Sequence, residues 1–268
     1  MFNSKLVSVA LISLLSVTFT SCDKDDDDSN SAPARKLTSI QTFDADNKPY
    51  STTTFTYDGE GRIVEKETIY AEELPMTTNT RKTYKYKGDM VEESNGEITF
   101  TYQLSSNGLL SSLDYQEPTW VKKLSWEYFN NHCTTYKEYN RFGAEDEPNP
   151  LFYDYTYNVT WEDDDLSKYK FTFESPNSKS ETTYTYTYAD STGQMYENKG
   201  QLAFCLDIIT TEIIEPVGML HGTSSKHLPL RMYTEGSLFR QYDWGLDIEG
   251  YPVRLTIGNG KSYKFTWE

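Results

Sequence analysis

The chain has 268 residues, of which 15% are aromatic and 22 are tyrosines, while hydrophobic residues total only 37%. A chain of this length buries a sizeable core, and this profile suits antiparallel sheets with one wet face better than helices or buried parallel sheets. The formal net charge of −16 repels a phosphate backbone, and no cluster of Lys or Arg opposes it. The composition therefore excludes nucleic acid as a partner.

Residues 1–21 are predicted to be a signal peptide. Lys5 precedes an apolar run from Leu6 to Phe19, and the small residues Thr20 and Ser21 follow. A membrane-spanning helix needs about 20 apolar residues, so this run is too short to be one. A secretory signal is the better interpretation, with a short uncleaved anchor as the alternative.

The next residues predict lipidation and export. Residues 19–22, Phe-Thr-Ser-Cys, resemble a bacterial lipobox, although Phe19 replaces the usual Leu. We expect acyl chains on Cys22 to anchor the protein in the outer membrane, since several chains together bind stably where one binds marginally. The run that follows resembles the export signal of Bacteroidales-type surface lipoproteins and consists of Asp23, Lys24, Asp25, Asp26, Asp27 and Asp28.

Residues 22–35 are therefore expected to be a lipidated, acidic, flexible tether. A run of like charges is also typical of an ordinary solvated tail. The export interpretation predicts exposure at the cell surface, and the tail interpretation leaves the protein facing the periplasm. Beyond Cys22 the chain has Cys133 and Cys205. An extracytoplasmic setting permits a disulfide between them, and two buried free thiols are the alternative.

A hairpin unit at residues 55–69 organises the remainder. Its sequence, FTYDGEGRIVEKETI, places an Asp-Gly-Glu-Gly turn between two stretches of β-rich composition. Degenerate versions of this pattern occur at residues 43–48, 106–110 and 246–253. We expect residues 36–268 to form a single antiparallel β domain.

Alternation with a period of two is persistent from residue 36 onward. Aromatic and aliphatic side chains share one strand face, for example at Tyr84 and Tyr86, Phe100 and Tyr102, Tyr153 to Trp161, Tyr169 to Phe173, Tyr184 to Tyr188 and Tyr263 to Trp267. Short turn signals join consecutive strands and predict a meander. Since the aromatic face must be covered to offset the entropy of ordering the chain, we expect the sheet to curl into a half-barrel or a single-layer twisted sheet.

One segment does not alternate. Residues 201–216 have apolar residues at helical spacing and predict a short helix that covers the aromatic face; a strand is the alternative. An irregular loop is expected to follow it, up to residue 229. Longer links are predicted at 140–150 and 189–200.

Several motifs are similar to those of known surface proteins. The Tyr-Asp-x-x-Gly-Arg pattern at residues 57–62 resembles tyrosine-aspartate repeats, also called YD or RHS-like repeats. The motifs at 184–188, 218–229, 247–253 and 264–267 resemble those of a Bacteroidales-type cell-envelope lipoprotein family. The resemblance covers most of the chain from residue 36. It implies an antiparallel β-architecture at the cell envelope, and it implies no activity because none is established for that family.

Two sets of residues are weighed as metal sites. His221 and His227, with Asp207 or Glu215, are candidate ligands, but a spacing of His-x5-His is not a recognised one, and His132 is the remaining histidine. The carboxylates at 163–165 and at 44–46 are candidate calcium ligands. Residues 44–55 depart from an EF-hand loop at Pro49 and Phe55, so carboxylates of hairpin turns are the preferred interpretation. We predict no metal and no cofactor.

Catalytic motifs are absent from the sequence: it has no nucleophile elbow, zincin helix or phosphate-binding glycine loop. We therefore assign no catalytic residue and lean against an enzyme. Trp120, Trp161 and Trp244 are candidates for a platform on which sugar rings stack, with burial in the core as the alternative. Residues 190–192, Asp-Ser-Thr, resemble a short O-glycosylation motif.

The leading hypothesis is a non-catalytic binding or accessory role for an outer-membrane lipoprotein, with a glycan or an envelope protein as ligand. A structural or assembly role in the envelope is the alternative, and a hydrolase is a third hypothesis. The sequence does not name the ligand-binding residues.

Overall fold

The computed structural model describes residues 35–71, 78–144, 150–200, 202 and 222–268. Contacts divide the chain into two units, residues Met1–Pro33 and Ala34–Glu268. The predicted signal peptide, Cys22 and the acidic run 23–28 lie outside the described residues. The description below concerns the second unit.

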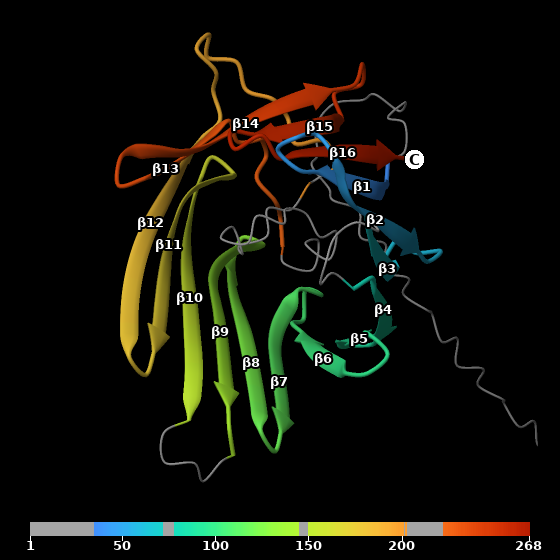
Figure 1. The fold of residues 1–268 in the computed structure, drawn as a ribbon, viewed down its shortest axis with the longest axis vertical. Helices are drawn as coiled ribbons and strands as arrows, with labels where there is room; N and C mark the ends of the chain where they lie inside the picture. Colours follow the sequence, from blue (N-terminus) through green and yellow to red (C-terminus); the bar gives the residue numbers. More distant parts are fainter. Residues whose placement is uncertain (1–34, 72–77, 145–149, 201, 203–221) are drawn as a thin grey trace, which may run out of the picture. The chain divides into compact units, whose positions relative to one another are not determined.

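The second unit is built from strands (Figure 1). The first eight are β1 (Leu37–Phe43), β2 (Pro49–Tyr57), β3 (Ile63–Tyr70), β4 (Thr80–Lys87), β5 (Met90–Ser94), β6 (Thr99–Leu104), β7 (Leu110–Glu117) and β8 (Trp120–Phe129). The others are β9 (His132–Phe142), β10 (Leu151–Glu162), β11 (Asp165–Ser175), β12 (Ser178–Thr187), β13 (Arg231–Thr234), β14 (Ser237–Leu246), β15 (Pro252–Ile257) and β16 (Ser262–Trp267). Each pairs antiparallel with its neighbours in sequence, so the predicted meander is confirmed.

The sheet closes into a barrel, and the prediction of a half-barrel or a single-layer twisted sheet was wrong. Strand β1 pairs with β16, with Ile40 opposite Phe265 and Phe43 opposite Ser262. Closure removes both free edges, which would otherwise present unpaired backbone groups. Local alternation cannot reveal this pairing, because it joins strands from opposite ends of the chain.

Helices are absent from the part of the chain that the structure describes. The helix predicted for residues 201–216 lies outside the described residues except at Leu202, which is irregular and 2% exposed. No helix long and apolar enough to cross a membrane was found among the residues described.

The connections alternate between two ends of the barrel. We name as rim A the end formed by the connections at 44–48, 95–98, 118–119, 176–177, 235–236 and 258–261. Rim B is formed by the connections at 58–62, 88–89, 105–109, 130–131, 163–164 and 247–251. Strand β1 starts at rim B, so the chain enters the barrel there.

Alternation assigns aromatic side chains to the inner face of the barrel and polar side chains to the outer face. On β10 and β11, for example, Tyr157 pairs with Phe171 on the inner face, while Asn158 pairs with Lys170 on the outer face. Tyr169, Leu255 and Met232 are fully buried inside at 0% exposure. The aromatic face is thus covered by closure of the sheet, which provides the burial that folding requires.

Aspartate turns recur in the barrel and explain the hairpin pattern seen in the sequence. Asp58 Oδ1 accepts hydrogen bonds from the backbone N–H groups of Glu60 and Arg62, both at 2.9 Å. The turns that begin at Asp44, Asp190 and Asp247 have the same two contacts at positions two and four residues later. In the Asp58 turn the residue before the last has φ of +81° and is Gly61, which takes this conformation without strain.

Candidate functional site

An aromatic belt follows the inner face of the barrel near rim A. We define it as Phe100, Tyr115, Trp120, Phe142, Tyr153 and Phe173, which lie on the successive strands β6 to β11. Their rings form an unbroken series of contacts: the ring centroids of Tyr115 and Trp120 are 5.1 Å apart, and those of Trp120 and Phe142 are 6.3 Å apart and stacked. The series continues from Phe142 to Tyr153 at 6.2 Å and from Tyr153 to Phe173 at 6.1 Å.

The belt differs from the core in its exposure. Phe142 is 40% exposed and the other rings of the belt are half-buried, whereas inner-face side chains midway along the barrel, such as Leu113, Tyr157 and Tyr169, are buried. Large aromatic surfaces that are partly open to solvent are energetically unfavourable for a monomer unless something covers them. The belt is therefore an aromatic surface of the described inner face that is partly open to solvent.

A carboxylate held by three donors lies beside the belt. Glu138 accepts hydrogen bonds from Lys122 Nζ at 3.0 Å, Asn140 Nδ2 at 2.8 Å and Tyr136 OH at 2.9 Å. Burial by itself would raise the pKa of Glu138, but the charge of Lys122 and the three donors outweigh it and hold the pKa below 4.5. Lys122 also lies over the ring of Phe100, 6.0 Å from its centroid. The ionised Glu138 carboxylate is therefore fixed in place by its three donors.

A polar arc adjoins the belt on β2 to β5. We define it as Thr53, Thr68, Lys82 and Glu93, which face inward by their strand pairing. The hydroxyls of Thr53 and Thr68 are 3.0 Å apart, and Lys82 Nζ lies 3.0 Å from Glu93 Oε1. Because Glu93 pairs directly with Phe100 across β5 and β6, the arc continues into the belt. The inner face near rim A thus joins aromatic rings to hydroxyls and paired charges.

The three tryptophans proposed as a sugar platform have different surroundings. Trp120 is part of the belt. Trp161 donates its Nε1 hydrogen to the carbonyl of Cys133 at 2.8 Å and lies 4.3 Å from the ring of His132. Trp244 donates to the carbonyl of Pro229 at 2.8 Å and stacks on a core ring. Of the three tryptophans, Trp120 belongs to the belt, while Trp161 and Trp244 pack near rim B.

At rim B a buried network holds the segment 222–230 against the barrel. Ser225 Oγ accepts a hydrogen bond from the backbone N–H of Leu166 at 3.1 Å and lies 3.0 Å from Tyr188 OH. Asn198 donates to the carbonyl oxygens of Leu202 and Ser225, at 3.1 and 2.9 Å. Since Ser225 is 4% exposed and its hydroxyl is engaged, its position is structural rather than that of a nucleophile.

The histidines are placed separately. His227 Nδ1 lies 2.7 Å from Asp165 Oδ2, and His132 Nε2 lies 3.2 Å from Asp164 Oδ1. His221, Asp207 and Glu215 lie outside the described residues. Within the ranges that are described, no three His, Cys, Asp or Glu side chains come together as metal ligands. Asp44 Oδ1, proposed as a calcium ligand, instead accepts from the backbone of its own turn.

Cys133 is a buried free thiol, and Cys205 lies outside the described residues. Burial raises the pKa of Cys133 to about 12, so the thiol stays protonated and unreactive at neutral pH. Ser191 of the proposed O-glycosylation motif is exposed, in a turn where Thr192 Oγ1 donates to Asp190 at 2.6 Å.

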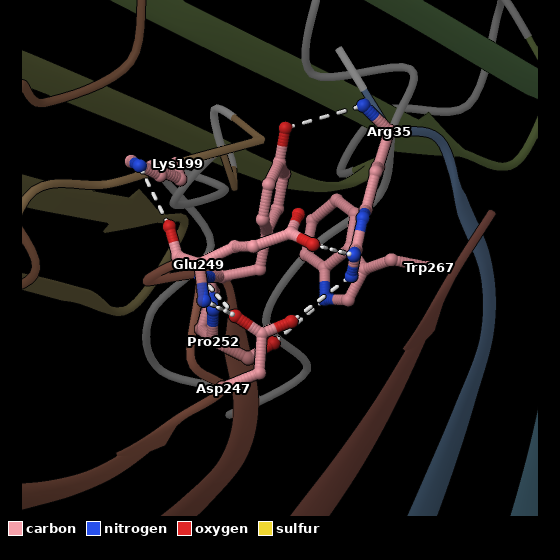
Figure 2. Close-up of polar contacts among 7 residues, drawn as sticks. Arg35, Lys199, Asp247, Glu249, Pro252 and Trp267 are labelled. Carbon is pink, nitrogen blue, oxygen red and sulfur yellow. Dashed lines mark hydrogen bonds and ion pairs between the residues drawn. The ribbon is translucent and has the colours of Figure 1, made fainter. Parts of the chain in front are cut away.

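The entry of the chain into the barrel is fixed by a junction at rim B, shown in Figure 2. Arg35 Nη1 lies 3.0 Å from Asp247 Oδ2, and Nη2 lies 2.5 Å from Glu249 Oε1. The backbone N–H of Arg35 donates to Tyr251 OH at 3.2 Å, and Lys199 Nζ donates to the carbonyl of Glu249 at 2.6 Å. The described chain therefore enters the barrel at rim B, the end opposite the aromatic belt.

The outer face of the barrel is polar. On β11 and β12 it consists of lysine, glutamate and threonine, with exposed ion pairs between Lys170 and Glu181 at 2.8 Å and between Lys179 and Glu174 at 2.7 Å. On β2 it is formed by Tyr50, Thr52, Thr54 and Thr56. A barrel that crosses a membrane has the opposite arrangement, with an apolar outer band and a polar interior.

Sequence reasoning missed the charged residues of the inner face, although a signal was present. Lys122 is in phase with Leu124 and Trp126 on β8, and Glu138 is in phase with Tyr136 on β9. Polar residues at positions that alternation assigns to the inner face are unusual, since buried charges need partners. This departure from the pattern identifies the site.

No protein family and no curated protein is matched by the chain. Solved structures share the fold, two porin-like proteins among them. A porin-like protein from Bacteroides uniformis ATCC 8492 matches 88% of this chain and 99% of its own at a TM-score of 0.61 and 15% sequence identity. A porin-like protein from Bacteroides vulgatus ATCC 8482 matches 87% of this chain and 99% of its own at a TM-score of 0.59 and 14% identity. At these identities the similarity shows a common barrel fold.

Proposed function

We propose that this protein is a lipid-anchored outer-membrane component that binds a ligand, either a glycan or an envelope protein, without catalysis. The aromatic belt carries the proposal, because it is a partly exposed aromatic surface next to fixed polar groups. Such a combination is typical of binding sites, where apolar contact provides affinity and a few polar groups provide specificity. The Bacteroidales-type lipoproteins that the chain resembles, and the porin-like structures that share its fold, are consistent with an envelope location.

We further propose that the barrel stands in water and that the anchor is Cys22 alone. Each Lys or Arg placed at the bilayer midplane on the lipid-facing side of a barrel costs about 2–4 kcal/mol. The outer face carries several such residues, among them Lys168 and Lys170 in the middle of the β11–β12 wall. Insertion of this face into lipid is therefore strongly unfavourable.

Lipid anchoring is tested with Cys22→Ala in the native host. We expect the variant to appear as a soluble protein or an uncleaved precursor. Mature variant that stays in the membrane fraction after carbonate extraction would show that the barrel itself is embedded, and would contradict the proposal.

The acidic run is tested separately. A variant in which the four aspartates at positions 25–28 are all replaced by Ala is expected to stay lipidated but to face the periplasm. Protease accessibility on intact cells distinguishes the two locations. Unchanged accessibility would mean that residues 23–28 are only a spacer.

Ligand binding is tested by presenting the purified full-length protein to an array of neutral and acidic glycans. Binding to any glycan class supports the proposal. If none of the glycans binds and the protein co-purifies stably with a membrane complex, the structural or assembly role is favoured instead. One observation favours the structural or assembly role: Tyr169 and Leu255 are fully buried, so this part of the inner face is filled by side chains.

A hydrolase would need two carboxylates that converge on a scissile bond. In the described part of the inner face, Glu93 and Glu138 are each paired with a lysine. The lowered pKa of Glu138 keeps that carboxyl ionised, so it is not suited to donate a proton as a general acid.

A further inference from the structure

The inner face near rim A has features that define the chemistry of its ligand more narrowly than the proposed function does. The belt presents rings in series along six neighbouring strands, β6 to β11, so a ligand that covers it must be extended rather than compact. It must also offer flat apolar faces, because partly open aromatic rings gain most from stacked contact.

Charge narrows the choice further. The inner face near rim A carries the carboxylates Glu93, Glu117 and Glu138. Glu93 pairs with Lys82 and Glu138 with Lys122, so each of these two pairs is neutral. Glu117 lies opposite Trp120 and accepts a hydrogen bond from Tyr115 OH at 3.1 Å. The protein as a whole carries a net charge of −16, which repels anionic ligands. An acidic polymer is therefore disfavoured.

Polarity excludes a purely apolar ligand. An acyl chain lying on the belt would remove water from the partly exposed Lys82–Glu93 and Lys122–Glu138 pairs without offering hydrogen bonds in return. Desolvating polar groups without replacing their hydrogen bonds costs free energy. A ligand rich in hydroxyls replaces those bonds.

We propose that the aromatic belt binds a neutral oligosaccharide, with sugar rings stacked along Trp120 and its neighbours and sugar hydroxyls hydrogen-bonded to the partly exposed Lys122–Glu138 and Lys82–Glu93 pairs. This inference rests on the proposed function, and it specifies the ligand class and the site. The described chain enters the barrel at rim B, so the belt lies at the opposite end from that junction.

Isothermal titration of the full-length, detergent-solubilised protein tests the proposal. The probes are neutral hexasaccharides of glucose, mannose and galactose, with hexagalacturonate as the acidic counterpart. Trp120→Leu and Phe173→Leu remove one ring each from different parts of the belt. Tyr139→Leu is the matched control, since Tyr139 lies on the outer face and stacks on Phe152 with centroids 6.2 Å apart.

We expect at least one neutral hexasaccharide to bind, and each belt variant to weaken binding by about threefold to tenfold per ring lost. The control variant should bind like the unmodified protein. Thermal melting identifies any variant that fails to fold, in which case the other belt variant decides the test.

Three outcomes would overturn the inference. Binding of neutral sugars that both folded belt variants retain would place the site elsewhere, and preferential binding of hexagalacturonate would refute the ligand class. Both results would leave the proposed binding function intact. Binding of no probe would refute the inference, and the glycan array would then decide whether the glycan form of the proposed function fails as well.

Discussion

Replacing Asp165 with Ala should destabilise the barrel much more than a change at its neighbour Asp164. Asp165 accepts two hydrogen bonds from His227, from the backbone N–H at 2.8 Å and from Nδ1 at 2.7 Å. Both side chains are largely buried, with 12% of the Asp165 side chain and 17% of the His227 side chain exposed. Each hydrogen bond to a charged group contributes about 1.5–3 kcal/mol, so we expect a loss of about 3–5 kcal/mol.

Asp164→Asn is the matched control. The Asp164 side chain is 71% exposed and lies 3.2 Å from His132 Nε2. Exposed ion pairs contribute about 0–1 kcal/mol. Asp164 has φ of +65°, which Asn tolerates well, so the turn itself should be preserved.

Thermal melting of both variants measures the difference. For a domain of this size each kcal/mol shifts the midpoint by about 2–4 °C, so Asp165→Ala should melt roughly 10 °C lower and Asp164→Asn within about 3 °C of the unmodified protein. Hydrogen exchange should also rise in residues 222–230 of Asp165→Ala, because His227 belongs to that segment. Equal shifts for the two variants would refute the argument that burial decides the strength of these pairs.

Three further predictions concern other parts of the barrel. Gly200→Ala should destabilise the fold by more than 1 kcal/mol in urea titration, because a Cβ there would lie 2.4 Å from the ring of Trp267 and Gly200 has φ of +80°; an unchanged midpoint would contradict the packing described. The lowered pKa of Glu138 means that its ion pair with Lys122 stabilises the fold above the ordinary glutamate pKa of about 4.3 and that this contribution is lost as the pH falls through the lowered value. Glu138→Gln should therefore reduce the loss of unfolding free energy as the pH falls below about 4.3. An unchanged pH dependence would mean that other carboxylates cause this loss of stability. Cys133 should resist thiol reagents at pH 8 in the folded protein, because its pKa is raised to about 12 and it is 3% exposed. It should react after unfolding, and mass spectrometry locates the adduct. Rapid labelling of the folded protein would refute its burial.

Most of the secondary structure follows from the alternation of side chains. Tyr155, Tyr157 and Val159 share one face of β10, as their spacing of two predicts. The turns were predictable for a similar reason, since Asp58 and Gly61 supply the backbone contact and the conformation that a tight connection requires. These features depend on residues close together in the chain.

The candidate site was predictable only in part. Trp120 was identified as an aromatic available for stacking, but Trp161 and Trp244 have the same residue type and lie in the packing near rim B. All three are half-buried, and what distinguishes them is which residues surround the ring, which sequence spacing does not contain. The same limit applied to Asp165 and His227, which pair although 62 residues separate them.

The sequence by itself determined the antiparallel strands, their turns and the assignment of aromatic and polar side chains to opposite faces, because these depend on contacts between near neighbours. Only the tertiary structure decided that the sheet closes, through the pairing of β1 with β16. Closure turns the aromatic face inward and leaves the outer face to lysine, glutamate and threonine. It also brings Glu93, Glu138 and the aromatic belt onto one inner surface near rim A. These are consequences of pairing between distant segments, whose free energy depends on the whole sheet rather than on any local pattern.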